Sequence, residues 1–120
     1  MRPYRYLALT PLLCGCVGPE APDAAVCQDI IHRLCLPPRC QAVDDAFRAG
    51  DACEEALLAR SGCANPDFTF TAVTRARALD CRLPLVREGA ARELAPGCLV
   101  VEEVVDTCPD LVQLLNGAGP

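Results

Sequence analysis

Residues 23–36 read DAAVCQDIIHRLCL, and this stretch decides the fold class. Its large apolar residues and cysteines recur at the three- and four-residue spacings that place side chains on one face of an α-helix. These positions are Val26, Cys27, Ile30, Ile31, Leu34 and Cys35. Asp23 is a residue type that often caps a helix N-terminus, and Pro37-Pro38 cannot continue the helix. The stretch therefore predicts a helix from Asp23 to about Leu36 with one buried stripe.

The polar residues of the same stretch are expected on the other side of this helix. Asp29 and Arg33 stand four residues apart, a spacing at which opposite charges on a helix surface attract each other weakly. His32 falls on the same side, and we expect it to be a solvated surface residue.

Towards the C-terminus, the helical spacing returns in short segments separated by Gly and Pro. We expect further helices over residues 40–49, 51–62, 71–82, 84–94 and 98–108, and a last turn or two through residue 115. Asp51 with Glu54 three residues later resembles a capping box, and Gly62 suits a helix end. Pro84 suits the first turn of a separate helix.

Two segments leave a choice between strand and another structure. Phe68-Thr69-Phe70-Thr71 alternates as a strand would, but it is short and has no evident partner, so after the turn at residues 65–67 we expect an extended loop. The segment 98–108 is rich in Val, which favours strands. Its valines come in adjacent pairs instead of alternating, and Glu102, Glu103 and Asp106 point away from the apolar stripe. Residues 23–120 thus predict one all-α domain, a small disulfide-stapled bundle of about four to six short helices.

The cysteines predict how this domain is stabilised. Eight of them lie between residues 23 and 120: Cys27, Cys35, Cys40, Cys53, Cys63, Cys81, Cys98 and Cys108. The only aromatic residues there are Phe47, Phe68 and Phe70, so the core is thin. Each disulfide adds about 2–4 kcal/mol, and disulfides persist in oxidising compartments. We therefore expect all eight to be disulfide-bonded in an exported protein.

The N-terminus carries a leader-like pattern. Arg2 and Arg5 precede a short apolar run, residues 7–13, which is far below the roughly 20 residues that span a bilayer. Leu13-Cys14-Gly15-Cys16 follows and resembles the lipobox of bacterial lipoprotein precursors, although Cys14 stands where Ala, Ser or Thr is commoner. The resemblance implies a signal peptide over residues 1–15, a lipid-modified (palmitate-bearing) Cys16 and a tether over residues 16–22.

Counting cysteines favours Cys16 as the lipid attachment site. Cleavage before Cys16 removes Cys14 and leaves eight cysteines for pairing, whereas modification at Cys14 would leave an odd number. An ordinary secretory leader cut near residues 21–25, giving a secreted soluble protein, is the alternative. Val17 is not the Asp that retains lipoproteins in the inner membrane in the best-known sorting rule. By that resemblance, the outer membrane is favoured over the inner.

Eight cysteines allow 105 pairings, and the sequence does not choose among them. If the first and third helices lie antiparallel, Cys27 can meet Cys63 and Cys35 can meet Cys53. That arrangement looks like a twin cysteine-helix hairpin, although the cysteine intervals on the two helices are unequal.

No motif for catalysis, a metal or a cofactor stands out. Structural zinc favours close pairs such as C-x2-C, and none lies within residues 23–120. Ser61 is the only Ser and His32 the only His, and nothing in their spacing brings them together with an orienting acid. We therefore expect no enzymatic activity, no metal and no cofactor; a hydrolase or a metal/redox protein is the unlikely alternative.

Charge and composition limit the partners. Without Arg2 and Arg5, 9 Arg face 16 Asp and Glu, a net charge of about −7. Such a surface repels nucleic acid and anionic lipid headgroups, so membrane attachment would depend on an N-terminal lipid. A protein partner cannot be named from the sequence.

The leader and the cysteine density are similar to those of the small, cysteine-rich lipoproteins of GC-rich Gram-negative bacteria, a resemblance that implies no activity. The expected function is that of a lipid-anchored cell-envelope protein acting by binding or structural contact. The alternative is a secreted inhibitor-like or toxin-neutralising module that presents the loop at residues 65–71. Exposed Phe side chains there would favour this alternative, and buried ones would count against it.

Overall fold

In a computed structural model, which describes residues 18–38, 40–88 and 95–117, these ranges form an all-helical domain with no strand. The predicted fold class is confirmed. The elements are α2 (Asp23–Cys35), α3 (Gln41–Phe47), the 3-10 helix η2 (Gly50–Ala52), α4 (Cys53–Ser61), α5 (Arg75–Glu88), α6 (Cys98–Thr107) and α7 (Pro109–Leu115).

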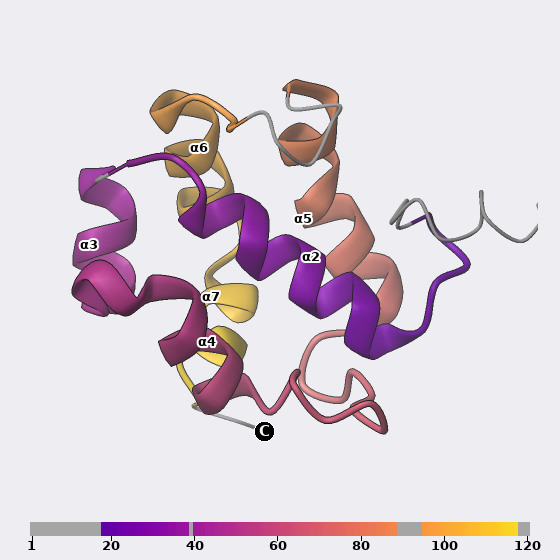
Figure 1. Cartoon of the computed structure of the whole chain (residues 1–120). Helices are drawn as coiled ribbons and strands as arrows, with labels where there is room; N and C mark the ends of the chain where they lie inside the picture. The colour runs from indigo at the N-terminus through magenta and orange to yellow at the C-terminus, as the bar shows by residue number, and fades with distance from the viewer. Residues whose placement is uncertain (1–17, 39, 89–94, 118–120) are drawn as a thin grey trace, which may run out of the picture.

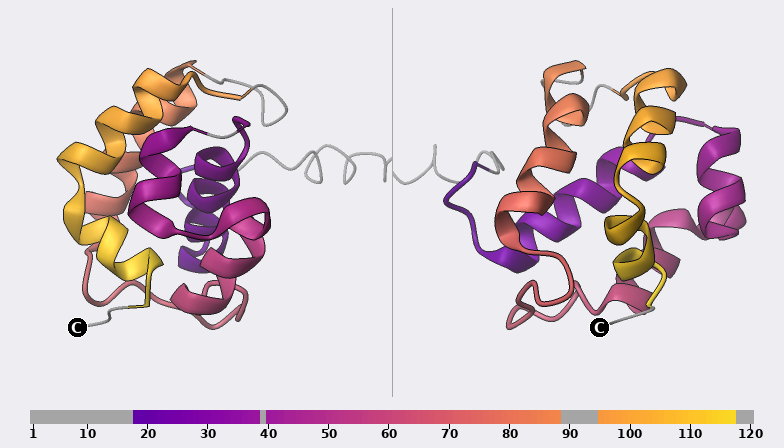
Figure 2. Two further views of the ribbon diagram at one scale, coloured as in Figure 1. Left: turned by 90° about the vertical axis from the view of Figure 1, so that its left-hand side faces the viewer. Right: turned by 180° about the vertical axis from the view of Figure 1, so that it is seen from behind.

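The helices pack as a ring around one core (Figure 1). Helix α2 lies between α4 and α5, α7 contacts α4 and α6, and α6 completes the ring against α5. Helix α3 packs on the outer side of this ring, against α6. Figure 2 shows α3 and α6 on the side of the domain opposite residues 18–22, where the chain enters α2.

Every α-helix contributes to the core. Helix α2 buries the stripe that its sequence predicts, because Ile30 and Ile31 have no exposed surface and Leu34 is 1% exposed. The other large side chains of the core come from the five remaining α-helices of the described ranges and from one loop: Phe47, Leu57, Val73, Leu85, Val101, Val104, Leu111 and Leu115. Phe47 is the one fully buried aromatic side chain among the described residues, so cross-links and aliphatic contacts carry most of the stability.

Two predicted N-terminal caps are wrong. Asp23 is the first residue of α2 and Pro22 occupies the N-cap position; the Asp23 carboxylate instead accepts a hydrogen bond from the Phe70 N–H, at 3.0 Å. The expected capping box at Asp51 is replaced by η2, and α4 begins two residues later, after Ala52. A tertiary contact thus takes the place of the cap at Asp23, and a 3-10 turn takes the place of the cap at Asp51. The predicted helix end at Gly62 is correct, with φ +83°.

Helix α5 differs most from expectation. The sequence predicts two helices divided at Pro84, but α5 is one helix with Pro84 inside it. Ala78, Cys81 and Leu85 continue a single buried stripe across the proline, and this burial outweighs the loss of one backbone hydrogen bond. The helix also starts later than expected, after Thr74, whose hydroxyl accepts a hydrogen bond from the Arg77 N–H at 3.1 Å. The predicted helix over residues 84–94 otherwise falls partly outside the described residues.

The Asp29–Arg33 pair is also placed differently from the prediction. The expected surface pair is buried, with 1% of Asp29 and 4% of Arg33 exposed. One carboxylate oxygen of Asp29 accepts hydrogen bonds from Nε of Arg33 and Nε of Arg82, each at 2.8 Å. Arg82 comes from α5 and is 7% exposed. This ionic cluster, Asp29 with Arg33 and Arg82, joins α2 to α5 inside the domain.

The C-terminal helix is tied back to α4. Arg60 donates hydrogen bonds to the Phe47 carbonyl, at 2.6 Å, and to the side-chain carbonyl of Asn116, at 3.0 Å. The Asn116 amide in turn donates to the Ala46 carbonyl at 2.9 Å. Gly117 follows with φ +83°, and a Cβ built there would lie 2.9 Å from the carbonyl oxygen of Arg60. The backbones approach closely here, and only glycine fits.

None of the helices in the described ranges combines the length and the apolar character that a membrane span requires.

Candidate functional site

All eight cysteines of the domain are paired in four disulfides. These are Cys27–Cys63, Cys35–Cys53, Cys40–Cys98 and Cys81–Cys108. The first two join α2 to the turn after α4 and to the first residue of α4, which is the pairing that the sequence suggests if those helices form an antiparallel hairpin. The other two join α3 to α6 and α5 to the α6–α7 junction, and local spacing does not predict them. Four disulfides indicate an oxidising, exported environment.

The disulfides differ in exposure. Cys27 and Cys63 have no exposed surface, and Cys81 and Cys108 are each 3% exposed. Cys35 and Cys53 are partly exposed, and Cys98 is an exposed residue. The Cys35–Cys53 and Cys40–Cys98 bonds are therefore the ones that a thiol reagent can approach from solvent.

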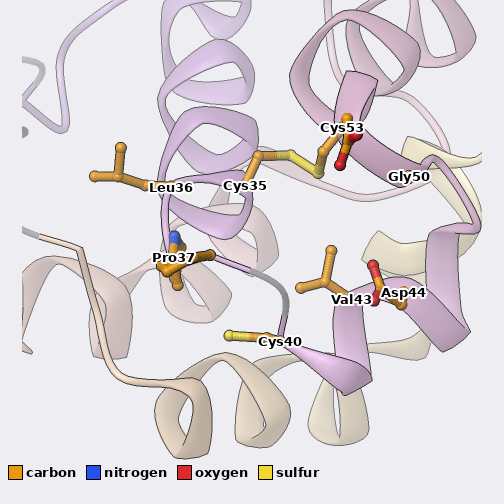
Figure 3. Close-up of a pocket in the computed structure, with 10 residues that line it drawn as sticks. Cys35, Leu36, Pro37, Cys40, Val43, Asp44, Gly50 and Cys53 are labelled. Atoms are coloured by element: carbon orange, nitrogen blue, oxygen red, sulfur yellow. A yellow bond between two sulfur atoms is a disulfide. The ribbon is translucent and has the colours of Figure 1, made fainter.

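A small pocket lies beside the Cys35–Cys53 disulfide (Figure 3). Its walls come from the end of α2, the start of α3, η2 and the first residue of α4, and Pro37, Val43 and Asp44 are among them. The cavity has a volume of about 180 Å³, below the roughly 300–1,000 Å³ of typical small-molecule sites. With one disulfide wall and few convergent polar groups, the pocket lacks a recognisable catalytic arrangement.

A longer groove lies between α3 and α6. Two adjoining hollows of about 300 Å³ each share Ala42, Asp45 and Glu102 in their walls. The remaining lining residues are Gln41, Ala46, Cys98, Leu99, Val105 and Asp106. Leu99 is 80% exposed, more than any other large apolar side chain in the described ranges. We call this surface the α3/α6 groove; it combines an apolar floor with three carboxylates.

The predicted surface histidine has an acidic neighbour. Nδ1 of His32 lies 3.3 Å from both carboxylate oxygens of Glu54, and the His32 side chain is 25% exposed. Ser61 lies at the other end of α4, where its hydroxyl accepts a hydrogen bond from the Cys63 N–H at 3.1 Å. Seven residues of helix place Glu54 and Ser61 about 10 Å apart. The structure therefore does not join His32, an acid and Ser61 into a triad.

Residues 65–67 form a turn and residues 68–71 follow as a loop without strand pairing, as predicted, but the aromatic side chains of this loop face inwards. Phe68 and Phe70 are partly buried, pack against the core and contact each other edge to face, with ring centroids 5.2 Å apart. The Phe70 N–H is also bound to Asp23. These contacts count against this loop as a protruding inhibitory segment.

Arg75 fixes the chain in front of α2. Its guanidinium donates hydrogen bonds to the carbonyls of Pro19 and Ala21, the latter at 2.6 Å, and pairs with Asp23 at 2.5 Å. Part of the predicted tether over residues 16–22 therefore packs on α5. Cys16, the predicted lipid attachment site, lies outside the described residues, as does the whole predicted signal peptide.

Two surface carboxylates are held in their charged form by their partners. The Phe70 N–H, together with Arg75, lowers the pKa of Asp23 below its ordinary value of 3.8. Arg77 binds Asp110 through Nε at 3.0 Å and through a terminal nitrogen at 3.2 Å, and this lowers the pKa of Asp110. Within the described ranges, no group of His, Cys, Asp or Glu side chains is arranged to hold a metal ion.

No protein-family model, curated protein sequence or solved structure matches this chain significantly. The inference of function therefore depends on the sequence and on the described geometry.

Proposed function

We propose that this protein is a lipid-anchored component of a bacterial cell envelope whose helical domain acts by binding or structural contact, without enzymatic activity. The observation that carries the proposal is the set of four disulfides, because such bonds persist outside the reducing cytosol. The lipobox-like residues 13–16 add the anchor. Val17 favours the outer membrane, and attachment there would depend on the lipid because the domain is acidic.

The Arg75 contacts sharpen the geometry of this anchor. The chain is held against α5 from Pro19 onwards, so only three residue steps separate the lipid-bearing Cys16 from a fixed point. At about 3.3–3.6 Å per residue these steps span roughly 10 Å. A free tether over residues 16–22 would span roughly 20–25 Å. The domain would thus sit close to the bilayer, with the end of the molecule near residues 18–22 facing the lipid.

Metabolic labelling with a radioactive fatty acid, combined with intact-mass analysis, tests the anchor. The mature protein should begin at Cys16 and carry acyl mass together with four disulfides. Cys16→Ser should abolish labelling. Cys14→Ser is the matched control and should leave labelling unchanged, because cleavage removes Cys14. A mature protein that starts near residues 21–25 without acyl mass would establish the secreted soluble form instead, and free thiols would remove the argument for export.

Neither competing function has equal support. The inhibitor-like reading requires accessible phenylalanines at residues 65–71, where Phe68 and Phe70 pack against the core. The hydrolase reading requires Ser61 beside His32, but His32 on α2 contacts Glu54 in the first turn of α4, whereas Ser61 is the last residue of that helix.

A further inference from the structure

We propose that the α3/α6 groove is the docking surface for a cationic amphipathic helix of a partner protein. This inference names the partner's chemistry and so rests on the proposed function as a binding protein. The groove offers an apolar floor from Ala42, Ala46 and Val105. Ala42 and Ala46 are one helical turn apart on α3, and their small side chains leave room for an approaching helix.

The charges of the groove determine the sign of the partner. Asp45, Glu102 and Asp106 line it, and none of the ion pairs found among the described residues involves them. Elsewhere in the domain, Asp23, Asp29 and Asp110 each bind an arginine of the chain itself. No arginine in the described part of the chain pairs with the groove carboxylates, so a cationic partner would meet them with complementary charge.

Leu99 supplies an apolar contact at one end of the groove. It precedes Glu102 by one helical turn on α6 and is 80% exposed. Leucine flanked by carboxylates complements a helix with apolar anchors at positions i, i+3, i+4 and i+7 and with Lys or Arg beside them. A second copy of this acidic chain would place carboxylates against carboxylates, and nucleic acid or anionic lipid would be repelled.

The groove is also pre-organised. The Cys40–Cys98 disulfide links the start of α3 to the start of α6, and Cys98 is itself part of the groove wall. Covalently fixed walls lose little conformational entropy on binding. Helices α3 and α6, whose residues line the groove, lie on the side of the domain opposite residues 18–22 (Figures 1 and 2), so an anchored protein would turn the groove away from the bilayer.

Fluorescence anisotropy of the exported, oxidised protein tests the proposal, with the fluorescein-labelled synthetic peptide LKKLLKLLKKLLKL as the probe. The groove variant carries Asp45→Asn, Glu102→Gln and Asp106→Asn. The matched control carries Glu55→Gln, Asp67→Asn and Asp80→Asn, three exposed acids outside the groove, so both variants have the same net charge. The groove variant should bind about tenfold more weakly than the control, since three exposed charge contacts are lost.

Leu99→Ser tests the apolar half of the groove at constant charge and should weaken binding severalfold. A control peptide in which serine replaces every leucine of the probe should bind the wild-type protein weakly. Its affinity should be no higher than the affinity of the groove variant for the unmodified probe. Circular dichroism and a thiol count distinguish a loss of binding from a failure to fold. Each variant must show the wild-type spectrum and no free thiols.

Equal affinities of the two charge variants would show generic attraction to an acidic protein and overturn the proposal, as would failure of the wild type to bind the probe. If the wild-type protein sediments as a dimer and Leu99→Ser dissociates that dimer, the groove binds a second copy of the chain and not a cationic partner. The two proposals can fail separately. Acyl mass at Cys16 without probe binding would support the lipid anchor and refute the docking surface. Probe binding without acyl mass would support the docking surface and refute the lipid anchor.

Discussion

Asp29→Asn should destabilise the domain more than any other single change of a charged side chain. The Asp29 carboxylate is shared by Arg33 and Arg82 at 2.8 Å each, and all three residues are at least nine-tenths buried. Asparagine keeps the size of the side chain but removes the negative charge that balances two buried guanidinium groups. Removing one partner of a buried ion pair costs about 3–5 kcal/mol.

The loss should be measured by urea unfolding at neutral pH with the disulfides intact. Far-UV circular dichroism is the suitable signal, because the chain has no Trp and loses helix on unfolding. For a domain of this size, 1 kcal/mol corresponds to about 4–8 °C in Tm, so the variant should melt at least about 12 °C below the wild type. Asp106→Asn makes the same chemical change at an exposed position and should stay within about 0.5 kcal/mol.

A triple variant separates charge from packing. Asp29→Leu with Arg33→Met and Arg82→Met removes the whole ionic cluster and fills its space with apolar groups. It should recover most of the stability lost in Asp29→Asn, because a buried ion pair can often be replaced by apolar residues without loss. The reasoning would be refuted by an Asp29→Asn variant that unfolds within about 1 kcal/mol of the wild type.

Three further predictions follow from the backbone, the surface charges and the disulfides. Gly117→Ala should lower the free energy of unfolding by about 2 kcal/mol or more, and Gly62→Ala by about 1 kcal/mol. Both glycines have φ +83°, but only a Cβ at residue 117 would meet a backbone oxygen. Equal losses of the two variants in chemical denaturation would contradict this. Because the pKa of Asp110 is lower in the folded protein than its ordinary value of 3.8, the Asp110 carboxylate stabilises the fold at pH values above 3.8, and this contribution disappears as pH falls through the folded pKa. The Tm difference between the wild type and Asp110→Asn should therefore narrow below about pH 4. During titration with dithiothreitol, alkylation mapping should find the exposed Cys98 modified before the fully buried Cys27 and Cys63. Simultaneous reduction of all four disulfides would contradict this prediction, because it would show that the disulfides open only on global unfolding.

Much of the secondary structure follows from local spacing in the sequence. The stripe of α2, the helix end at Gly62 and the exposed carboxylates of α6 agree with the structure. These features depend on neighbours within one or two helical turns, which a single sequence displays directly. The first two disulfides also follow once α2 and α4 are taken as antiparallel.

The remaining features depend on contacts between distant parts of the chain. Arg82 lies 53 residues from Asp29, so local charge spacing places Asp29 on the surface although the cluster buries it. The continuous α5 arises because tertiary burial of Leu85 outweighs the helix-breaking tendency of Pro84. The α3/α6 groove combines residues 41–46 with residues 98–106, and long-range contacts bring these segments together: the packing of α3 on α6 and the Cys40–Cys98 bond.

The order of the cross-links along the chain has a consequence for proteolysis. The spans of Cys27–Cys63, Cys40–Cys98 and Cys81–Cys108 overlap one after another, so every peptide bond from residue 27 to residue 108 lies inside at least one closed loop. A protease that hydrolyses one such bond leaves both fragments covalently joined. The nicked protein keeps a single mass on a non-reducing gel and divides only after reduction, so a single cleavage between residues 27 and 108 cannot release a fragment of the domain.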